Sequence, residues 1–494
     1  MEDISPARRA PRASKLRLVL TCACACALAA GCSTLAPQRR ADLPAVPVPA
    51  QWQSVQAQAA QTASTPAAPD APARDWWRAF GDAQLSALIE RALQANASVE
   101  QAQANVRRAR ALVAVQAAGL APQLNADASA QRSKTSGFVA RNSYSVGLDA
   151  SWEADLFGAQ RSAVDAASAD AQAAAIDLGD TQVSLAAEVA LAYQQWAGTK
   201  ARLAVARENL AAQEETLQIT AWRTQAGLAS SLQLEQARTA TEQTRAQIPA
   251  LESTLAQTAH ALAVLTGRAP GALPELQASA ATQAPAASQA VAATIPADTL
   301  RQRPDVRRAE AQVQAAAARA QQAQADRLPS LRLSGNIGLS ALTIGALGSS
   351  GSGVGALLAS LSAPLFDGGA RRAQGEAQDA ALAAARAAWR ASVLGALRDV
   401  ENALVALASA QQRRGTLDRA AEAAAQAALL ARDRYRSGLI DFQVVLDTQR
   451  TLLSAQDSLV AAQTDVAQAQ VQLIKALGGG WRSDLAADTP APRT

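Results

Sequence analysis

Residues 144–154 read Tyr-Ser-Val-Gly-Leu-Asp-Ala-Ser-Trp-Glu-Ala, with apolar and polar side chains in alternation. Because successive side chains of a β-strand point to opposite faces, this alternation predicts a strand with one apolar face. Residues 330–340 repeat the pattern, and 124–130 and 357–365 show it more weakly. Each segment approaches the ~9–11 residues that a strand needs to cross a bilayer. We therefore predict four transmembrane strands, paired as 122–132 with 143–155 and as 329–340 with 355–366.

The connections inside the two strand pairs fit a membrane location. Residues 131–143 are polar and 348–355 are rich in Gly and Ser, which suits hairpin tips at the cell exterior. Two ordinary soluble β-hairpins are the alternative on the pattern alone. In lipid, an open sheet edge leaves backbone groups without hydrogen-bond partners, and the smallest known barrels have about eight strands. Four membrane-spanning strands would therefore require several copies of the chain to share one pore.

Long helices are predicted by two stretches without proline, 123–248 and 365–489, which are rich in Ala, Gln, Glu and Arg. We expect helices at 159–226 and 229–266, at 304–326, and at 369–436 and 440–477. The helix 159–226 would be roughly 100 Å long, which no globular core requires. The last helix carries apolar pairs every seven residues, from Val445/Leu446 to Leu473/Ile474, which predicts a left-handed supercoil. On that segment alone, a plain structural coiled coil is the better explanation.

The two halves of the chain repeat each other. The first structural repeat is predicted at 76–270 and the second at 299–478, each with a helix, a strand pair and two long helices. The offset drifts from 207 through 209 to 211, which indicates small insertions. The matching residues are Val99, Pro122 and Leu124 with Val306, Pro329 and Leu331; Leu156-Phe157 with Leu365-Phe366; and Arg223, Gly227 and Gly267 with Arg434, Gly438 and Gly478. Residues 271–298 are predicted as a linker and 479–494 as a C-terminal tail.

The N-terminus has the features of an export signal. A basic stretch precedes the apolar run Leu18 to Ala30, which is too short to span a bilayer as a helix but suits a signal peptide at 1–31. The run ends in Leu-Ala-Ala-Gly-Cys at 28–32, which resembles a bacterial lipobox and predicts a covalent lipid on Cys32. An ordinary signal peptide with an incidental Cys is the alternative. The Pro-, Ala- and Gln-rich residues 32–75 are expected to form a lipidated tether.

Composition excludes several classes of function. The formal net charge is +4, but residues 1–31 hold five basic and two acidic residues, so the remainder carries only +1. That balance does not support a nucleic-acid-binding patch. A single His argues against zinc sites and His-based catalytic triads, and no phosphate-binding loop is found. We expect neither an enzyme nor a protein with a cofactor, apart from the covalent lipid.

Six motifs in order resemble the TolC family, specifically its lipidated outer-membrane efflux channels, the NodT-like branch. The resemblance covers nearly the whole mature chain and implies a mainly α protein with membrane β-structure. It implies a homotrimer with a twelve-stranded β-barrel in the outer membrane and a long coiled α-helical barrel in the periplasm. The motifs are Trp76-Trp77 with Phe80, Asp82, Leu85 and Leu88-Ile89; Arg303-Pro304-Asp305-Val306 with Ala309-Glu310; Leu328-Pro329-Ser330-Leu331; Pro364 to Gly369; Arg434-Tyr435 with Gly438, Phe442, Val445-Leu446-Asp447 and Gln449-Arg450; and Lys475 to Trp481.

The resemblance also implies partners. These are a periplasmic adaptor protein and an inner-membrane efflux pump, commonly of the resistance-nodulation-division type, which would supply the energy. Outer-membrane lipid would surround the barrel, and drugs or other toxic small molecules would pass through it. Which pump, adaptor and substrate the chain serves is not encoded in a recognisable motif.

Gate and docking residues follow from the same resemblance. Gly227 and Gly438 suit tight interhelical turns, where positive φ favours Gly. With Arg434 and Tyr435 they would form the periplasmic tip at which the adaptor docks. Asp447 would line the closed aperture, where three carboxylates repel anions and attract cations; a solvated surface Asp is the alternative. Gln443 departs from the bulky apolar residue that is frequent at its position, and its first-half counterpart Leu232 would compensate.

Two other classes of protein compete with a channel. A periplasmic adaptor also carries long helical hairpins, but it has one hairpin and compact β-domains rather than two homologous halves with amphipathic strand pairs. A structural coiled-coil lipoprotein has no use for the strands. We therefore favour the passive exit channel of a tripartite efflux pump.

Overall fold

The computed structural model describes residues 41–47, 49, 52–53, 75–273, 276 and 303–481. The predicted signal peptide, Cys32, most of the tether, most of the linker and the tail beyond 481 lie outside these residues. The chain divides into two compact units. The described part of one unit falls in 41–44, Arg107–Ala173 and Ala309–Trp389; that of the other falls in Ala45–Val106, Ala174–Arg308 and Arg390–Thr494. Each unit draws on both predicted repeats, so the repeats and the compact units divide the chain differently.

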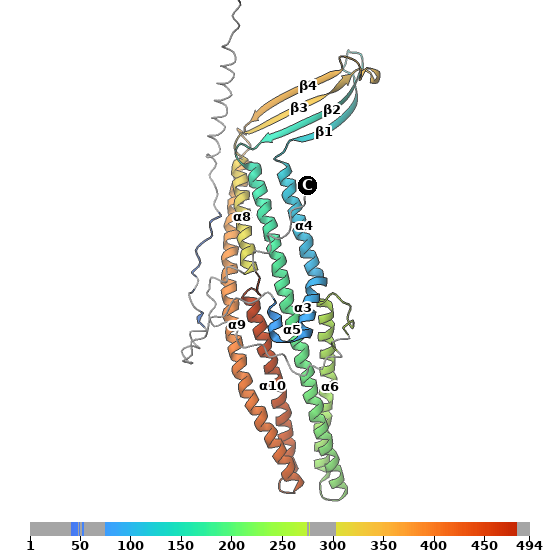
Figure 1. Cartoon of the computed structure of the whole chain (residues 1–494), viewed down its shortest axis with the longest axis vertical. Helices are drawn as coiled ribbons and strands as arrows, with labels where there is room; N and C mark the ends of the chain where they lie inside the picture. Colours follow the sequence, from blue (N-terminus) through green and yellow to red (C-terminus); the bar gives the residue numbers. More distant parts are fainter. Residues whose placement is uncertain are drawn as a thin grey trace, which may run out of the picture. The chain divides into compact units, whose positions relative to one another are not determined.

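The first unit contains an antiparallel sheet in the order β1-β2-β3-β4 (Figure 1). The strands are β1 (Gln123–Ser133), β2 (Arg141–Ala154), β3 (Ser330–Ala341) and β4 (Gly353–Ser362). The central pair β2–β3 joins the two repeats in a register from Tyr144 opposite Ala341 to Ala154 opposite Leu331. β4 ends at Ser362 rather than at the predicted residue 366. Pro364 accounts for this early end, because proline has no N–H to donate to a ladder.

The sheet keeps the predicted alternation of apolar and polar faces. Val146 lies opposite Leu339, and Leu148 lies opposite Ile337, so these four apolar side chains share one face. All four are exposed in the single chain. On the other face, the Ser129 and Ser145 hydroxyls lie 2.8 Å apart. The face pattern is that of a sheet with one side in an apolar environment and one side in water.

Parts of four helices complete the first unit: α4 (Ala97–Ala118), α5 (Ala159–Gln225), α8 (Pro304–Ala325) and α9 (Ala370–Arg436). Arg319 of α8 forms an ion pair with Asp170 of α5. Arg371 of α9 donates to the carbonyl oxygen of Asp326, the residue that follows α8. Trp152 donates from Nε1 to the Leu120 carbonyl oxygen at 2.9 Å, which fastens β2 to the end of α4.

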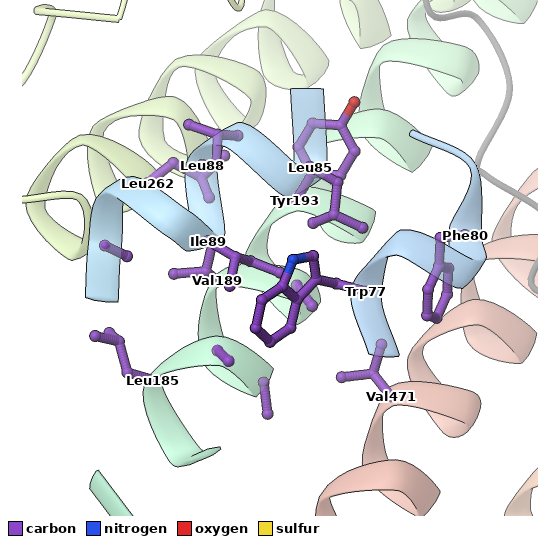
Figure 2. Packing of buried hydrophobic residues seen from close by; sticks show 14 of the residues in the cluster. Trp77, Phe80, Leu85, Leu88, Ile89, Leu185, Val189, Tyr193, Leu262 and Val471 are labelled. Atoms are coloured by element: carbon purple, nitrogen blue, oxygen red, sulfur yellow. The ribbon is translucent and has the colours of Figure 1, made fainter. Parts of the chain in front are cut away.

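The second unit is built around an apolar core (Figure 2). A short 3-10 helix (Trp76–Phe80) and α3 (Ala83–Ala95) insert Trp77, Leu85 and Ile89 against α5, α6 (Ser231–Leu265) and α10 (Phe442–Ala476). Full burial of each such side chain stabilises the fold by about 1.5–3 kcal/mol. The opening tryptophan motif therefore acts as an apolar plug between the long helices.

Asp82 connects this plug to α5. Its carboxylate accepts hydrogen bonds from the amides of Gln84 and Leu85, which caps the start of α3. It also accepts from the Tyr193 hydroxyl at 2.7 Å. Burial, together with this carboxylate, raises the pKa of Tyr193 well above its usual value. Tyr193 therefore stays a neutral donor at any physiological pH.

The long helices begin and end within about two residues of the ranges expected from sequence. A helix that is both long and apolar enough to cross a bilayer does not occur among the described residues.

Candidate functional site

The α5–α6 and α9–α10 connections have the same backbone geometry. In the first, the amide of Leu228 donates to the Arg223 carbonyl at 2.8 Å and that of Gly227 donates to Thr224 at 3.0 Å. In the second, Leu439 donates to Arg434 at 2.9 Å and Gly438 donates to Tyr435 at 3.0 Å. This is the Schellman motif, which needs a left-handed residue just after the helix. Gly227 and Gly438 supply it with φ of 74° and 73°.

The helices that leave these turns begin differently. Ser230 caps α6 in a reciprocal box: its hydroxyl accepts from the Gln233 amide, and the Gln233 side chain accepts from the Ser230 amide. Asp441 occupies the same place before α10 but makes no side-chain capping hydrogen bond. The first turn is therefore held by a cap, and the second needs another source of stability.

An apolar cluster supplies that stability at the second turn. The Tyr435 and Phe442 rings lie 5.4 Å apart at an interplanar angle of 52°. Tyr435 is only 7% exposed and Phe442 is fully buried. The other members of the cluster are Ala237, Ala240, Ala431, Val445 and Leu446. Tyr435 therefore stabilises the second turn from inside and does not itself form an exposed docking surface.

The ends of α5 and α9 are tied together by two arginines. The Arg223 guanidinium lies 4.6 Å from the centre of the Tyr435 ring and donates to the Tyr435 carbonyl oxygen at 3.4 Å. Arg436 of α9 also contacts α5, through an ion pair with Glu215 at 2.7 Å. Arg223 was missed as a site residue in the sequence, although its repeat relation to Arg434 placed it at the equivalent turn.

The three predicted gate residues lie on two different helices. Gln443 and Asp447 are both exposed on α10, and the Gln443 amide donates to the Asp447 carboxylate at 3.0 Å. Leu232 is exposed on α6 and lies outside the apolar cluster. Residues 232 and 443 are equivalent in the two repeats, and Gln236 is the first-half counterpart of Asp447. Arg434 is exposed, and its carbonyl group closes the second turn.

Farther along the same helices, α5 and α10 meet through polar side chains. Thr216 accepts from Gln449 at 2.9 Å, and Asn209 donates to Gln456 at 2.7 Å. Arg202 forms a bidentate pair with Asp457 at 2.7 and 3.0 Å. The hydrogen bond to Asp457 raises the pKa of Arg202 above its usual value. The α5–α10 contacts in this region are therefore polar, whereas those around the 3-10 helix and α3 are apolar.

The Arg303-Pro304-Asp305 motif forms a second polar cluster. Arg303 donates to the carbonyl oxygen of Ala476, at the end of α10, at 2.6 Å, and it is paired with Asp305 at 2.8 Å. The cluster borders a cavity of 370 Å³ that is also lined by Asp180. Burial raises the pKa of Asp180, an effect that Arg308 opposes. An arginine at a helix C-terminus satisfies free carbonyl groups and complements the helix dipole, so we assign this motif a structural role.

Among the described residues, no group of three or more His, Cys, Asp or Glu side chains is arranged to hold a metal ion.

Comparison with known proteins gives one consistent result. A family model described as outer membrane efflux protein matches residues 88–268 and 295–479. The pyoverdine export outer membrane protein OpmQ of Pseudomonas putida is 35% identical over 465 residues, which cover 92% of this chain and 95% of that protein. The toluene efflux pump outer membrane protein TtgF of Pseudomonas putida is 32% identical over 469 residues, covering 91% and 94%. The solved outer-membrane channel OprN superimposes with a TM-score of 0.81 at 34% identity, covering 90% and 100%.

Proposed function

This chain belongs to the outer membrane efflux protein family, and from that membership we propose that three copies build a passive exit duct for toxic small molecules. The outer-membrane location and the role in efflux follow from the family. The observation that carries the duct is the four-stranded sheet with an apolar face and two unpaired edges, β1 and β4. Each unpaired backbone group in hydrocarbon costs several kcal/mol, so β4 of one copy must pair with β1 of the next. Three copies close twelve strands.

The exposed surface of the two hairpin turns supports docking of a periplasmic adaptor. Leu228 and Leu439 follow the two glycines at equivalent places, and both side chains are exposed. Exposed apolar side chains of this kind mark interaction sites when they gather in one patch. The adaptor would connect the duct to an inner-membrane pump, which supplies the energy. The relatives named above export pyoverdine and toluene; for this chain we propose small molecules selected by its own pump.

Asp447 is our candidate for the ion-selective constriction at the periplasmic end. Its carboxylate is exposed one helical turn from Gln443, and among the described residues no ion pair neutralises it. Three copies would place three carboxylates around one axis, which attracts cations and repels anions. Leu232 would supply the apolar part of the constriction from α6.

The remaining parts of the proposal concern the N-terminus and the chemistry. Residues 1–31 would be removed as a signal peptide, and Cys32 would carry the lipid that anchors the tether 32–75 in the outer membrane. Several acyl chains on one residue anchor stably, whereas one chain is marginal.

We propose that the protein is not an enzyme and uses no cofactor besides this lipid. Cys32→Ser should abolish labelling by a radioactive fatty acid, and unchanged labelling would remove the anchor from the proposal.

Single-channel recording in planar bilayers tests the duct and its constriction together. The unsubstituted protein should conduct, and Asp447→Asn should reduce cation selectivity and block by multivalent cations. Asp433→Asn is the matched control, because Asp433 is an exposed carboxylate near the same turn but lies on α9. An inserted trimer that does not conduct would contradict the duct. Equal effects of the two substitutions would contradict the role of Asp447.

A further inference from the structure

The sheet edges are not the only surface left open in a single copy. We propose that Leu365 and Phe366 of one copy pack against the α4–β1 connection, residues 119–122, of the next copy. This contact rests on the proposed function, because it requires neighbouring copies in a ring. It would lie just beyond the end of the strands, where the backbone pairing of β4 has stopped.

Leu365 and Phe366 are unusually exposed for large apolar side chains. Leu365 is 97% exposed and Phe366 is 92% exposed. They follow β4, the strand whose outer edge has no partner strand among the described residues of a single copy. Burying both side chains against a neighbour would remove their apolar surface from water, which favours association. A pair of this kind, continuous with an open sheet edge, indicates a protein contact.

The internal repeat supplies a template for that contact. Leu156-Phe157 is the same dipeptide in the first repeat and follows β2, the strand that pairs with β3. Both residues are half-buried and line a cavity of 560 Å³ together with Leu328 and Pro329 of the α8–β3 connection. The first pair therefore lies beside the connection that enters the neighbouring strand. By the repeat, the second pair should lie beside the connection that enters β1 of the next copy.

The burial of α4 and α8 points to the same neighbour. In the first unit, α8 contacts α5 through Arg319, and Asp326, which follows α8, contacts α9; Val313 and Ala320 of α8 are fully buried. At the corresponding end of α4, Val115 is 63% exposed, whereas Leu112, which is 52% exposed, lines a cavity with residues of α5, α8 and α9 of the same copy. α8 belongs to the second repeat, whereas α5, which it contacts on one side, belongs to the first repeat. The exposed side of α4, which carries Val115, should therefore meet α9 of the neighbouring copy, next to Leu365 and Phe366.

A lipid-facing role is the competing explanation for two exposed apolar residues. The template argues against it, since Leu156 and Phe157 turn toward a cavity between chain connections. Pro364 also interrupts the strand before the pair, so the alternation that would direct side chains to lipid does not continue through it.

Cysteine cross-linking in membranes tests the contact in the full chain. The double variant Phe366→Cys, Ala121→Cys should give covalent dimers and trimers with a short thiol cross-linker, and each single variant should give monomers. The matched control Phe157→Cys, Leu328→Cys places the same chemistry inside one copy, so it should stay monomeric on a denaturing gel.

A second measurement avoids dependence on cross-linker geometry. Leu365→Ser with Phe366→Ser should lower the temperature at which the trimer dissociates, whereas Leu439→Ser, which removes a 73% exposed leucine at a hairpin turn, should not. Conducting trimers without cross-links, with a label at residue 366 quenched from the lipid phase, would overturn the contact and leave the duct standing. An unsubstituted protein that is monomeric and does not conduct would overturn both.

Discussion

The two hairpin turns share a backbone and differ in what stabilises them. Both close with the same two hydrogen bonds and a glycine in the left-handed region. The second turn adds a buried aromatic cluster, whereas the first has Thr224, Ser231 and Glu235 at the equivalent places of Tyr435, Phe442 and Leu446. In exchange, the first turn has the capping box of Ser230. The two repeats therefore share the backbone of the turn but stabilise it with different side chains.

The proposed gate shows the same divergence. One helical turn apart, α6 carries Leu232 and Gln236, whereas α10 carries Gln443 and Asp447. The apolar residue and the charged residue thus occur on different hairpins. In a trimer, three leucines and three carboxylates would alternate around the periplasmic end. A constriction built in this way would combine an apolar barrier with a selective charge.

The largest expected difference between the turns comes from the aromatic cluster. Phe442→Ala should cost about 3–5 kcal/mol of local stability, because it leaves a cavity among Tyr435, Val445 and Leu446. Ser231→Ala, at the equivalent place on an exposed surface, should change stability by less than about 0.5 kcal/mol. Amide hydrogen exchange at the two turns measures both effects. Similar losses of protection would mean that the cluster does not stabilise the second turn.

Substitution of either turn glycine should cost the same stability, because the two turns have the same backbone geometry. Gly227→Ala and Gly438→Ala should each cost about 1–2 kcal/mol, because a left-handed conformation is unfavourable for alanine. Neither added methyl group would meet an atom within 4 Å, so the cost comes from φ alone. Gly395→Ala is the control: it lies inside α9 with equally open surroundings and should stabilise the helix by up to ~1 kcal/mol. Thermal unfolding of all three variants decides the point.

Removing the capping side chains should give a smaller difference in stability, and here the first turn should lose more than the second. Ser230→Ala should destabilise the start of α6 by about 1 kcal/mol, since it removes the hydroxyl that the Gln233 amide donates to. Asp441→Ala should cost less, because its side chain accepts no capping hydrogen bond. Protection of the first-turn amides of α6 and α10 is the measurement. A larger loss at α10 would reverse the assignment of the cap to the first turn.

The smallest expected effect concerns the arginines of the two turns. Arg223→Met should cost about 0.5–1 kcal/mol through the lost contact with the Tyr435 ring. Arg434→Met changes the equivalent but exposed side chain and should leave stability nearly unchanged. Thermal unfolding of the pair provides the comparison, and equal costs would show that the ring contact contributes nothing specific.

Much of this architecture was predictable from sequence. The family, the fold class, the outer-membrane location and the efflux role are confirmed. Sequence was sufficient because period-two alternation, proline-free stretches and glycines at repeated offsets are local signals. The predicted end of β4 at residue 366 was wrong. The prediction followed the alternation at 357–365 and did not allow for Pro364, which has no N–H to donate to a strand ladder. Cys32 and the gate residues stay predictions.

Long-range side-chain contacts could not be predicted in the same way. The Arg223–Tyr435 contact joins residues far apart in the chain, and only their places in two equivalent turns hinted at it. The burial of Tyr435 depends on Ala237 and Ala240 of another hairpin, whose small size carries no signal by itself. The pairing of Arg303 with the last carbonyl groups of α10 likewise appears only once the helices are packed.

The unpaired edges of β1 and β4 have a consequence for biogenesis. A newly exported copy has two rows of free backbone groups and the exposed leucines Leu357 and Leu361 on β4. Such an edge promotes aggregation with any similar strand it meets in water. Transit to the bilayer must therefore be brief or chaperoned, and copies that insert together avoid the hazard. Slow delivery would reduce the yield of this protein before any effect on transport appeared.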